Sequence, residues 1–133
     1  MAKSMLWAGV VMAGLEGVAF AAAKDECKVV GHWAAMVTVY CPAKTAPSDL
    51  GSWLGGIKAE YLKAPGRQVH FHVFSDEKRV PKDSKQFFAL SDDDYDKLAI
   101  GRADFNENTG VKSFDCKRSP GDKQLRSCND LLP

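Results

Sequence analysis

The chain begins with an apolar segment that ends in three alanines, and all four of its cysteines come after this segment. A basic residue lies near the start, residues 5–20 are mostly apolar, and the alanines at positions 21–23 supply the small side chains that a signal peptidase needs. Polar residues begin directly afterwards. We therefore expect residues 1–23 to be a secretory signal peptide, and residues 24–133 to form the folded, secreted or periplasmic protein.

Two other interpretations of the first segment stay open. Glu16 interrupts the apolar run, and a carboxylate resists transfer into lipid. A retained membrane anchor would need a longer run without such a charge. A retained amphipathic helix in the cytosol would need a polar stripe, which the segment lacks. The signal-peptide interpretation fits better, and it predicts a mature protein without a membrane span.

Export makes disulfide formation the expected fate of the cysteines. The short loop between the third and fourth cysteines, Cys116 and Cys128, favours a bridge between them. The first two, Cys27 and Cys41, would then form the other bridge. A straight strand between the first two would separate their ends by roughly 46 Å, whereas a disulfide joins Cα atoms less than about 7 Å apart. This pairing therefore requires a chain reversal, which we expect near Gly31; otherwise both bridges tie the first strand to the C-terminal region. The four residues are Cys27, Cys41, Cys116 and Cys128.

Composition limits the protein to one domain and excludes some partners. About 110 residues remain after cleavage, enough for a modest hydrophobic core. The formal net charge stays near the +1 of the full sequence, so no long-range field favours nucleic acid or an anionic membrane. The basic residues near the C-terminus are interrupted by Asp115 and Asp122, as is typical of a solvated surface. We expect a monomer that does not bind nucleic acid.

Hydrophobic periodicity predicts an α+β fold with its elements in the order β-α-β-α-β-β. Apolar side chains recur at helical spacing over residues 48–62, with Ser48 as the expected cap, and Ser91 followed by three aspartates is a typical helix start. We expect a single disulfide-stabilised domain in which a mixed sheet of about four strands carries both helices on one face. The predicted strands are residues 29–40, 68–75, 100–106 and 111–117.

Three features of this sheet are predicted in more detail. Residues 29–40 are apolar on both faces, which indicates one long or central strand. The following helix makes a strand–helix–strand unit with a right-handed crossover, so the first two strands should form a parallel or mixed pair. The last two strands should form a hairpin around an Asn- and Gly-containing turn at residues 107–110.

Two histidines at alternate positions of the second predicted strand are the sharpest chemical signal. His70 and His72 project from the same face of a strand, which suits two ligands of one zinc or copper ion. Asp76 or His32 could supply a third ligand, with zinc as the possible cofactor. An ordinary exposed sheet face is the simpler explanation of the two histidines, because no complete ligand set is visible in the sequence.

The same strand face also suggests a binding surface. If both helices cover the other side, His70, His72 and Phe74 lie on an open face. Arg102 and Asp104 join them if the hairpin pairs with this strand, which would make a small anion-binding face.

No recognisable catalytic constellation is present. The sequence has no GxSxG elbow, and four oxidised cysteines leave no thiol nucleophile. The leading hypothesis is a small exported binding protein without a cofactor, whose ligand or protein partner is undetermined; whether it is an enzyme stays undecided. The alternatives are a metal-dependent hydrolytic enzyme that uses His70 and His72, and an inhibitor-like or structural envelope module.

Overall fold

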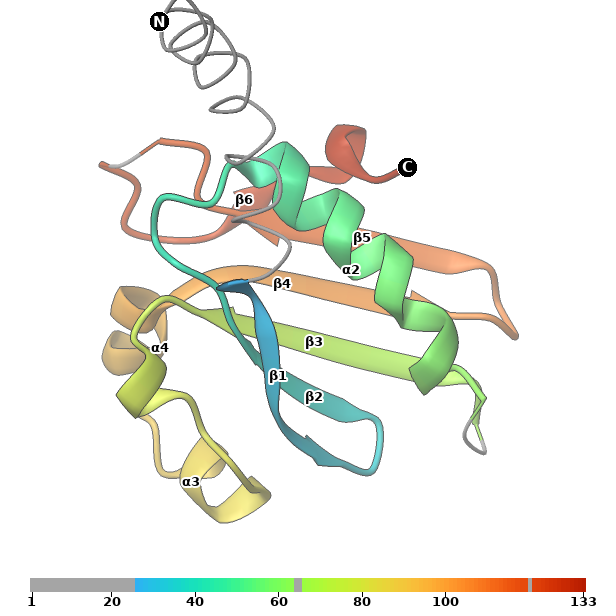
Figure 1. The fold of residues 1–133 in the computed structure, drawn as a ribbon, viewed down its shortest axis with the longest axis horizontal. Helices are drawn as coiled ribbons and strands as arrows, with labels where there is room; N and C mark the ends of the chain where they lie inside the picture. Colours follow the sequence, from blue (N-terminus) through green and yellow to red (C-terminus); the bar gives the residue numbers. More distant parts are fainter. Residues whose placement is uncertain (1–25, 64–65, 120) are drawn as a thin grey trace, which may run out of the picture.

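A computed structural model describes residues 26–63, 66–119 and 121–133 (Figure 1). The expected signal peptide lies outside the described residues. Within them the chain forms one mixed sheet in which each strand neighbours the next along the sequence, and only β2 and β3 are parallel. The strands are β1 (Lys28–Trp33), β2 (Met36–Tyr40), β3 (Gln68–Phe74), β4 (Ala99–Asn106), β5 (Val111–Cys116) and β6 (Arg126–Ser127).

The parallel pair is connected by helix α2 (Pro47–Tyr61), which confirms the predicted strand–helix–strand unit. Proline is well placed at a helix start because its missing N–H would lack an intrahelical partner there. The helix therefore begins one residue earlier than expected, after Ala46, and Ser48 does not cap it. In Figure 1 α2 lies across one face of the sheet.

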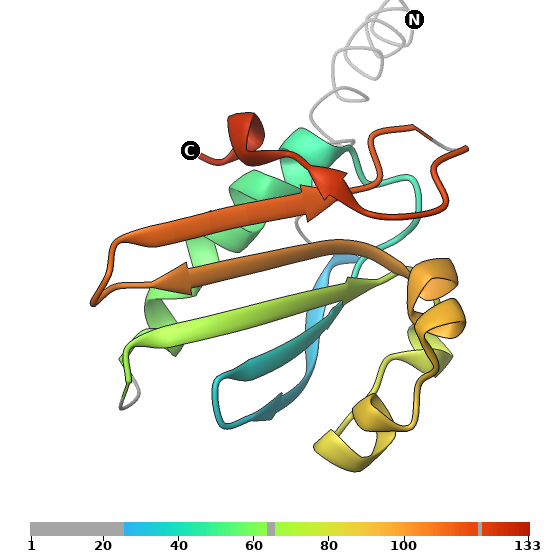
Figure 2. The same ribbon diagram turned by 180° about the vertical axis from the view of Figure 1, so that it is seen from behind.

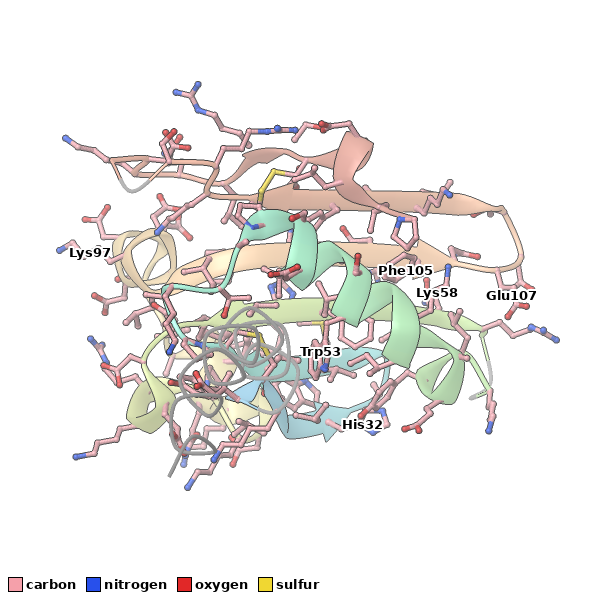
Figure 3. The ribbon with its side chains drawn as sticks, turned by 45° about the horizontal axis from the view of Figure 1, so that its top comes forward. His32, Trp53, Lys58, Lys97, Phe105 and Glu107 are labelled. Carbon is pink, nitrogen blue, oxygen red and sulfur yellow. A yellow bond between two sulfur atoms is a disulfide. The ribbon has the colours of Figure 1, made fainter. Side chains whose placement is uncertain are left out.

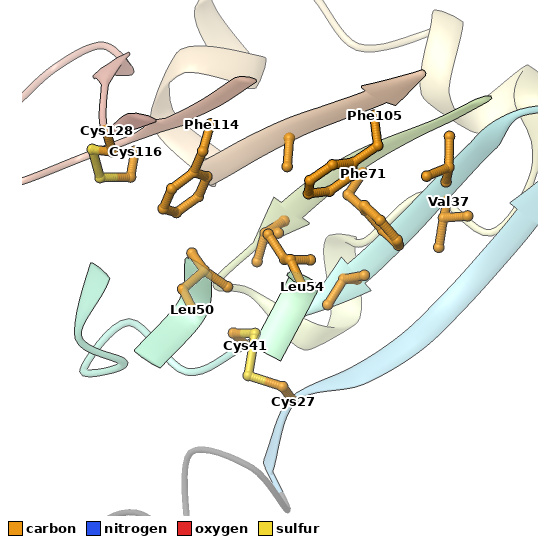
Figure 4. Close-up of a cluster of buried hydrophobic side chains, with 14 residues drawn as sticks. Cys27, Val37, Cys41, Leu50, Leu54, Phe71, Phe105, Phe114, Cys116 and Cys128 are labelled. Carbon is orange, nitrogen blue, oxygen red and sulfur yellow. A yellow bond between two sulfur atoms is a disulfide. The ribbon is translucent and has the colours of Figure 1, made fainter. Parts of the chain in front are cut away.

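The main hydrophobic core fills the space between α2 and the sheet. Leu50 and Leu54 point from the helix toward Phe71 of β3 and Phe114 of β5, and all four side chains are almost completely buried (Figure 4). Each fully buried side chain of this size stabilises the fold by about 1.5–3 kcal/mol. This packing stabilises α2, although Gly55 and Gly56 near its middle have low helix propensity.

The segment predicted as one long strand is a hairpin. β1 and β2 are antiparallel, and Ala34 adopts a left-handed conformation with φ of 50° in the tight turn between them. β2 is apolar because it lies inside the sheet and is covered on both faces, whereas β1 is the edge strand and is mostly exposed or half-buried. The chain reverses a few residues after the expected position; Gly31 instead marks a register shift within β1.

The hairpin brings the first two cysteines together, with 4.2 Å between their Cα atoms. The structure has the disulfides Cys27–Cys41 and Cys116–Cys128, which is the pairing that the loop lengths favour. The second bridge ties β5 to the C-terminal segment, where β6 is followed by a short 3-10 turn, Asn129–Leu131. Both bridges lie at the edge of the main core.

The sheet has six strands in the described residues rather than about four, and the helices do not share one face. Helix α4 (Asp92–Leu98) packs against the face opposite α2, where Leu98 and Tyr95 contact the buried ring of Phe74. Helix α3 (Ser84–Phe88) lies beside it, after a 3-10 turn at Glu77–Arg79. The prediction failed here because an amphipathic pattern shows that a helix has a core side, but not which face of a sheet it covers.

The start of α4 and the hairpin of β4 and β5 agree with the sequence. Ser91 caps α4 by accepting a hydrogen bond from the Asp94 backbone N–H at 3.1 Å. β4 pairs with β3 on one side and with β5 on the other, so the hairpin continues the sheet as expected. No helix in the described part of the chain is both long and apolar enough to cross a membrane.

Candidate functional site

The strand register places a group of polar side chains on the sheet face opposite α2. His70 of β3 lies opposite Asp104 of β4, and Asp104 lies opposite Ser113 of β5. Two residues further along the strands, Arg102 of β4 lies between His72 of β3 and Asp115 of β5. Alternation along each strand sends all of these side chains to one side. We call the half-exposed members the polar face: His70, Arg102, Asp104, Ser113 and Asp115.

The first row of the polar face is joined by hydrogen bonds. His70 Nδ1 lies 2.6 Å from Asp104 Oδ1, and Ser113 Oγ donates to Asp104 Oδ2 at 3.3 Å. The side chains of His70 and Asp104 are 37% and 35% exposed. Both oxygens of the carboxylate are therefore engaged, and the His70 ring is held with its Nε2 edge free of this pairing.

The second row is an ion pair. Arg102 donates to Asp115 at 2.6 Å, and this hydrogen bond raises the pKa of the guanidinium further above its usual value. Among the described residues, the buried Nε of Arg102 has no hydrogen-bond partner. The guanidinium therefore keeps donor capacity beyond its bond to Asp115.

His72 belongs to the same strand face, but it is covered. The His72 Nδ1 atom lies 2.6 Å from the hydroxyl of Tyr95, which belongs to α4. His72 is only 9% exposed. Burial lowers the pKa of His72 to about 4 and raises the pKa of Tyr95 to about 12. At neutral pH the two side chains are therefore an uncharged hydrogen-bonded pair.

Helices α3 and α4 lie at one end of the sheet (Figure 2), and their aromatic side chains form a cluster next to His72. The Phe87 ring packs against His72, with 4.8 Å between ring centroids, and against Trp33 at 6.0 Å. Phe88 packs edge-on against Phe87 and is 75% exposed, an unusual exposure for so large an apolar side chain. The surface thus combines half-exposed polar groups with a protruding aromatic ring.

The structure brings together most of the residues that the sequence suggested for ligand binding. His70, His72, Arg102 and Asp104 are neighbours through the β3–β4 register. The prediction that Phe74 lies on an open face is wrong, because α4 covers this part of the sheet and the Phe74 ring is completely buried.

The suggested metal ligands are not assembled. Asp76 instead accepts a hydrogen bond from the Lys78 backbone at 3.2 Å, as the cap of the following 3-10 turn. In the described part of the chain no three His, Cys, Asp or Glu side chains are grouped closely enough to hold an ion. Nδ1 of each histidine is already occupied, by Asp104 in one case and by Tyr95 in the other.

Three members of the arrangement were missed by the sequence interpretation. Ser113 and Asp115 could have been found from the alternation of the predicted hairpin, which sends Phe114 to the core and its neighbours to the other face. The third is Tyr95, whose hydroxyl reaches His72 from α4. No sequence signal connects it to His72, because their contact depends on the face that α4 covers.

The polar groups do not form a hydrolytic triad. A serine nucleophile needs its hydroxyl against the base, with a carboxylate behind the base. Here Ser113 bonds the carboxylate Asp104 rather than His70. The arrangement is suited to hydrogen bonding with a ligand rather than to activating the hydroxyl.

Comparison of the chain with protein-family models, curated proteins and solved structures finds no match.

Proposed function

We propose that this domain acts by binding a protein partner, which lies on the polar face and contacts the adjoining ring of Phe88. The observation that carries the proposal is the connection of this ring, 75% exposed, to an ordered set of half-exposed polar groups: Phe88 packs on Phe87, and Phe87 packs on His72, the strand neighbour of Arg102. Aromatic anchors beside satisfied polar groups are the usual composition of a protein interface.

The polar groups support binding because they are already organised. His70, Asp104 and Ser113 are linked by hydrogen bonds, and Arg102 is held by Asp115. A partner therefore meets side chains that lose little conformational freedom on association. The same pairing argues against catalysis, because neither the hydroxyl nor the guanidinium is positioned to act on a substrate alone.

A protein is the partner that best suits this surface. The groups are spread over three adjacent strands, so a binding molecule has to span a broad sheet face. The face also carries both signs of charge, with one guanidinium and two carboxylates, which favours a partner of mixed charge over a polyanion.

We also propose that the protein is exported and works in an oxidising compartment. Two disulfides are typical of such compartments, and they fit the signal peptide expected at residues 1–23. This makes the search for a partner an extracellular or periplasmic one.

The proposal is tested by quantitative capture. The full chain, with a C-terminal tag, is expressed in the cells that naturally produce it, and co-purifying proteins are measured by mass spectrometry. Phe88→Ala should reduce the capture of the specific partner by roughly thirtyfold, which corresponds to the loss of about 2 kcal/mol that an interface hot spot supplies.

A matched control is Val29→Ala, which removes an apolar side chain that is also exposed, at 38%, but belongs to β1. This variant should capture as much partner as the wild type. The assignment to this face would be wrong if Phe88→Ala captured as much partner as Val29→Ala, whether both retained the partner or both lost it.

One observation favours metal binding as a second candidate function. Metal-bound histidines commonly give their other ring nitrogen to a carboxylate, as His70 does to Asp104. Zinc titration of the purified protein, followed by histidine NMR signals, tests this. Saturable shifts that vanish in His70→Ala support a metal site, and unchanged signals at a zinc excess remove it.

A further inference from the structure

A second surface, at the C-terminal end of α2, concentrates positive charge. A groove of about 490 Å³ lies where α2 ends and β3 begins, beside the turn between β4 and β5. Three of its lining residues are cations, Lys58, Lys63 and Arg67, and one is a carboxylate, Glu107. The local formal charge of +2 exceeds the +1 of the whole chain, which indicates an anionic ligand.

Two of these cations are held in place. Lys58 Nζ lies 4.8 Å from the centre of the Phe105 ring, a cation–π contact that Figure 3 shows at one end of α2. Arg67 pairs with Glu107 at 3.0 Å, and Figure 3 places Glu107 in the adjoining turn. One carboxylate cannot use all five N–H donors of a guanidinium, so Arg67 keeps donors for a second acceptor.

The backbone around Arg67 is also specialised. Arg67 has φ of 48° and follows Gly66 with φ of 93°, and the left-handed region is uncommon for a residue other than glycine. The neighbouring turn holds this conformation, because the Glu107 N–H donates to the Arg67 carbonyl at 2.9 Å and the Asn108 amide donates to the Gly66 carbonyl at 3.0 Å. Strained conformations fixed from outside occur preferentially at functional sites.

Compensation of the helix dipole does not account for the whole cluster. The C-terminal end of a helix carries about half a negative charge. Lys58 is the basic residue in the last turn of α2 and is sufficient to offset it. Arg67 belongs to the turn before β3, outside the helix.

We propose that this groove binds a tetrahedral oxyanion, the phosphate or sulfate group of an ester. The local charge of +2 attracts such a group, which carries up to two negative charges in a phosphate monoester and one in a sulfate ester. A guanidinium fixed on one side by a carboxylate can offer its other N–H groups to two oxygens of the group. The groove is distinct from the polar face, because it is lined by residues of α2 and of the adjoining turns, whereas the polar face lies on the side of the sheet opposite α2.

The test is a titration of the full, purified protein with inorganic phosphate and, separately, with inorganic sulfate at constant ionic strength. Binding is followed by backbone and arginine side-chain NMR signals. Both anions should produce saturable shifts centred on Lys63, Arg67 and Glu107. The free ions test the oxyanion site itself. A phosphate monoester and a sulfate ester of the same alcohol, titrated in the same way, then distinguish the two sources of the group, since the tighter ester is the one that the groove prefers.

Charge-removing variants make the test specific. Arg67→Asn keeps a residue that tolerates positive φ, so it removes the guanidinium without forcing the turn to rearrange. It should weaken binding of the better anion by at least about fivefold, the effect expected when a charge-assisted hydrogen bond is lost. Lys63→Gln should weaken it in the same direction.

The control is Lys78→Gln, which removes one positive charge from an exposed position in another part of the protein. It should leave the affinity within about twofold of the wild type, since distant exposed charges are largely screened. Absence of saturable shifts in the wild type, or equal weakening by Lys78→Gln and Arg67→Asn, overturns the proposal, because diffuse surface charge then explains the response.

Discussion

The buried imidazole of His72 should make the fold lose stability in mild acid. The ring is surrounded by Phe87 of α3 and Tyr95 of α4, and the charged groups that face it are Arg102 and Asp104 of β4 and His70 of its own strand. Burial lowers its pKa from 6.5 to about 4, partly opposed by the nearby Asp104 carboxylate. In the unfolded chain the same ring titrates near its ordinary value.

The sign and size of the effect follow from these two pKa values. As the pH falls from about 6.5 to 4, the unfolded chain takes up a proton that the folded protein does not, so the free energy of unfolding decreases in this window. Each pKa unit corresponds to about 1.4 kcal/mol. The contribution is complete above pH 6.5 and falls by roughly 3 kcal/mol toward pH 4, with most of the loss present at about pH 4.5.

The assay is urea unfolding at about pH 7.5 and about pH 4.5. Other groups also titrate between these values, so the informative quantity is the difference between the wild type and a variant without the imidazole. His72→Phe combined with Tyr95→Phe removes the ring and its hydroxyl partner together, which avoids leaving a buried polar group unpaired. This double variant should lose roughly 3 kcal/mol less than the wild type over the acid step.

The single variant Tyr95→Phe is the control, because it keeps the buried imidazole. It should retain the acid sensitivity of the wild type, although its stability at neutral pH is lower. An equal loss of stability in the wild type and the double variant would show that His72 titrates normally, and the burial argument would then be wrong.

Three further predictions concern stability, each read from urea unfolding midpoints at neutral pH. Replacing Cys116 and Cys128 together with serine should lower the free energy of unfolding by about 2–4 kcal/mol, because the disulfide restricts the unfolded chain; an unchanged midpoint would show that the bridge adds nothing. Gly31→Ala should lower the free energy of unfolding by about 1–3 kcal/mol, since the added Cβ would lie 2.7 Å from a backbone carbonyl oxygen. Gly56→Ala should not lower it, because a Cβ there would meet nothing within 4 Å. A similar loss in both variants would contradict the close packing at Gly31. Ser91→Ala removes the cap of α4 and should cost about 1 kcal/mol, unlike the conservative Ser91→Thr; equal losses in the two variants would count against the cap.

Local patterns in the sequence were sufficient for much of the fold. The helical spacing of Leu50 and Leu54, the cap at Ser91 and the Asn- and Gly-containing turn each act over a few residues, and each predicted element is present. The short loop between Cys116 and Cys128 favoured the observed disulfide pairing, but the alternative of two long-range bridges stayed open until the β1–β2 hairpin was known to bring Cys27 and Cys41 together.

The failures share a physical cause. Residues 29–40 are largely apolar, and a hairpin whose second strand is buried on both faces gives much the same pattern as one buried strand. The turn at Ala34 carries no glycine, asparagine or proline that would have marked it. Which face α4 covers depends on long-range packing against Phe74, so the burial of that ring could not be inferred from its own segment.

The candidate site divides in the same way. Placing His70 beside Asp104 required only strand alternation and the pairing of β3 with β4. The pairing of His72 with Tyr95, and the exposure of Phe88, required the positions of α3 and α4 on the sheet. The sequence interpretation therefore predicted part of the polar face, but not the aromatic cluster beside it.

The most direct test of binding at the polar face is site-specific photo-crosslinking in the cells that produce the protein. A photoreactive amino acid is placed at Phe88 or Val111, which are exposed on the polar side of the sheet, or at Ser52, which is exposed on α2 on the opposite side. We predict a discrete adduct of higher mass from the first two positions and none from Ser52. An adduct formed only at Ser52, or with equal yield at all three positions, would contradict a partner bound at this face.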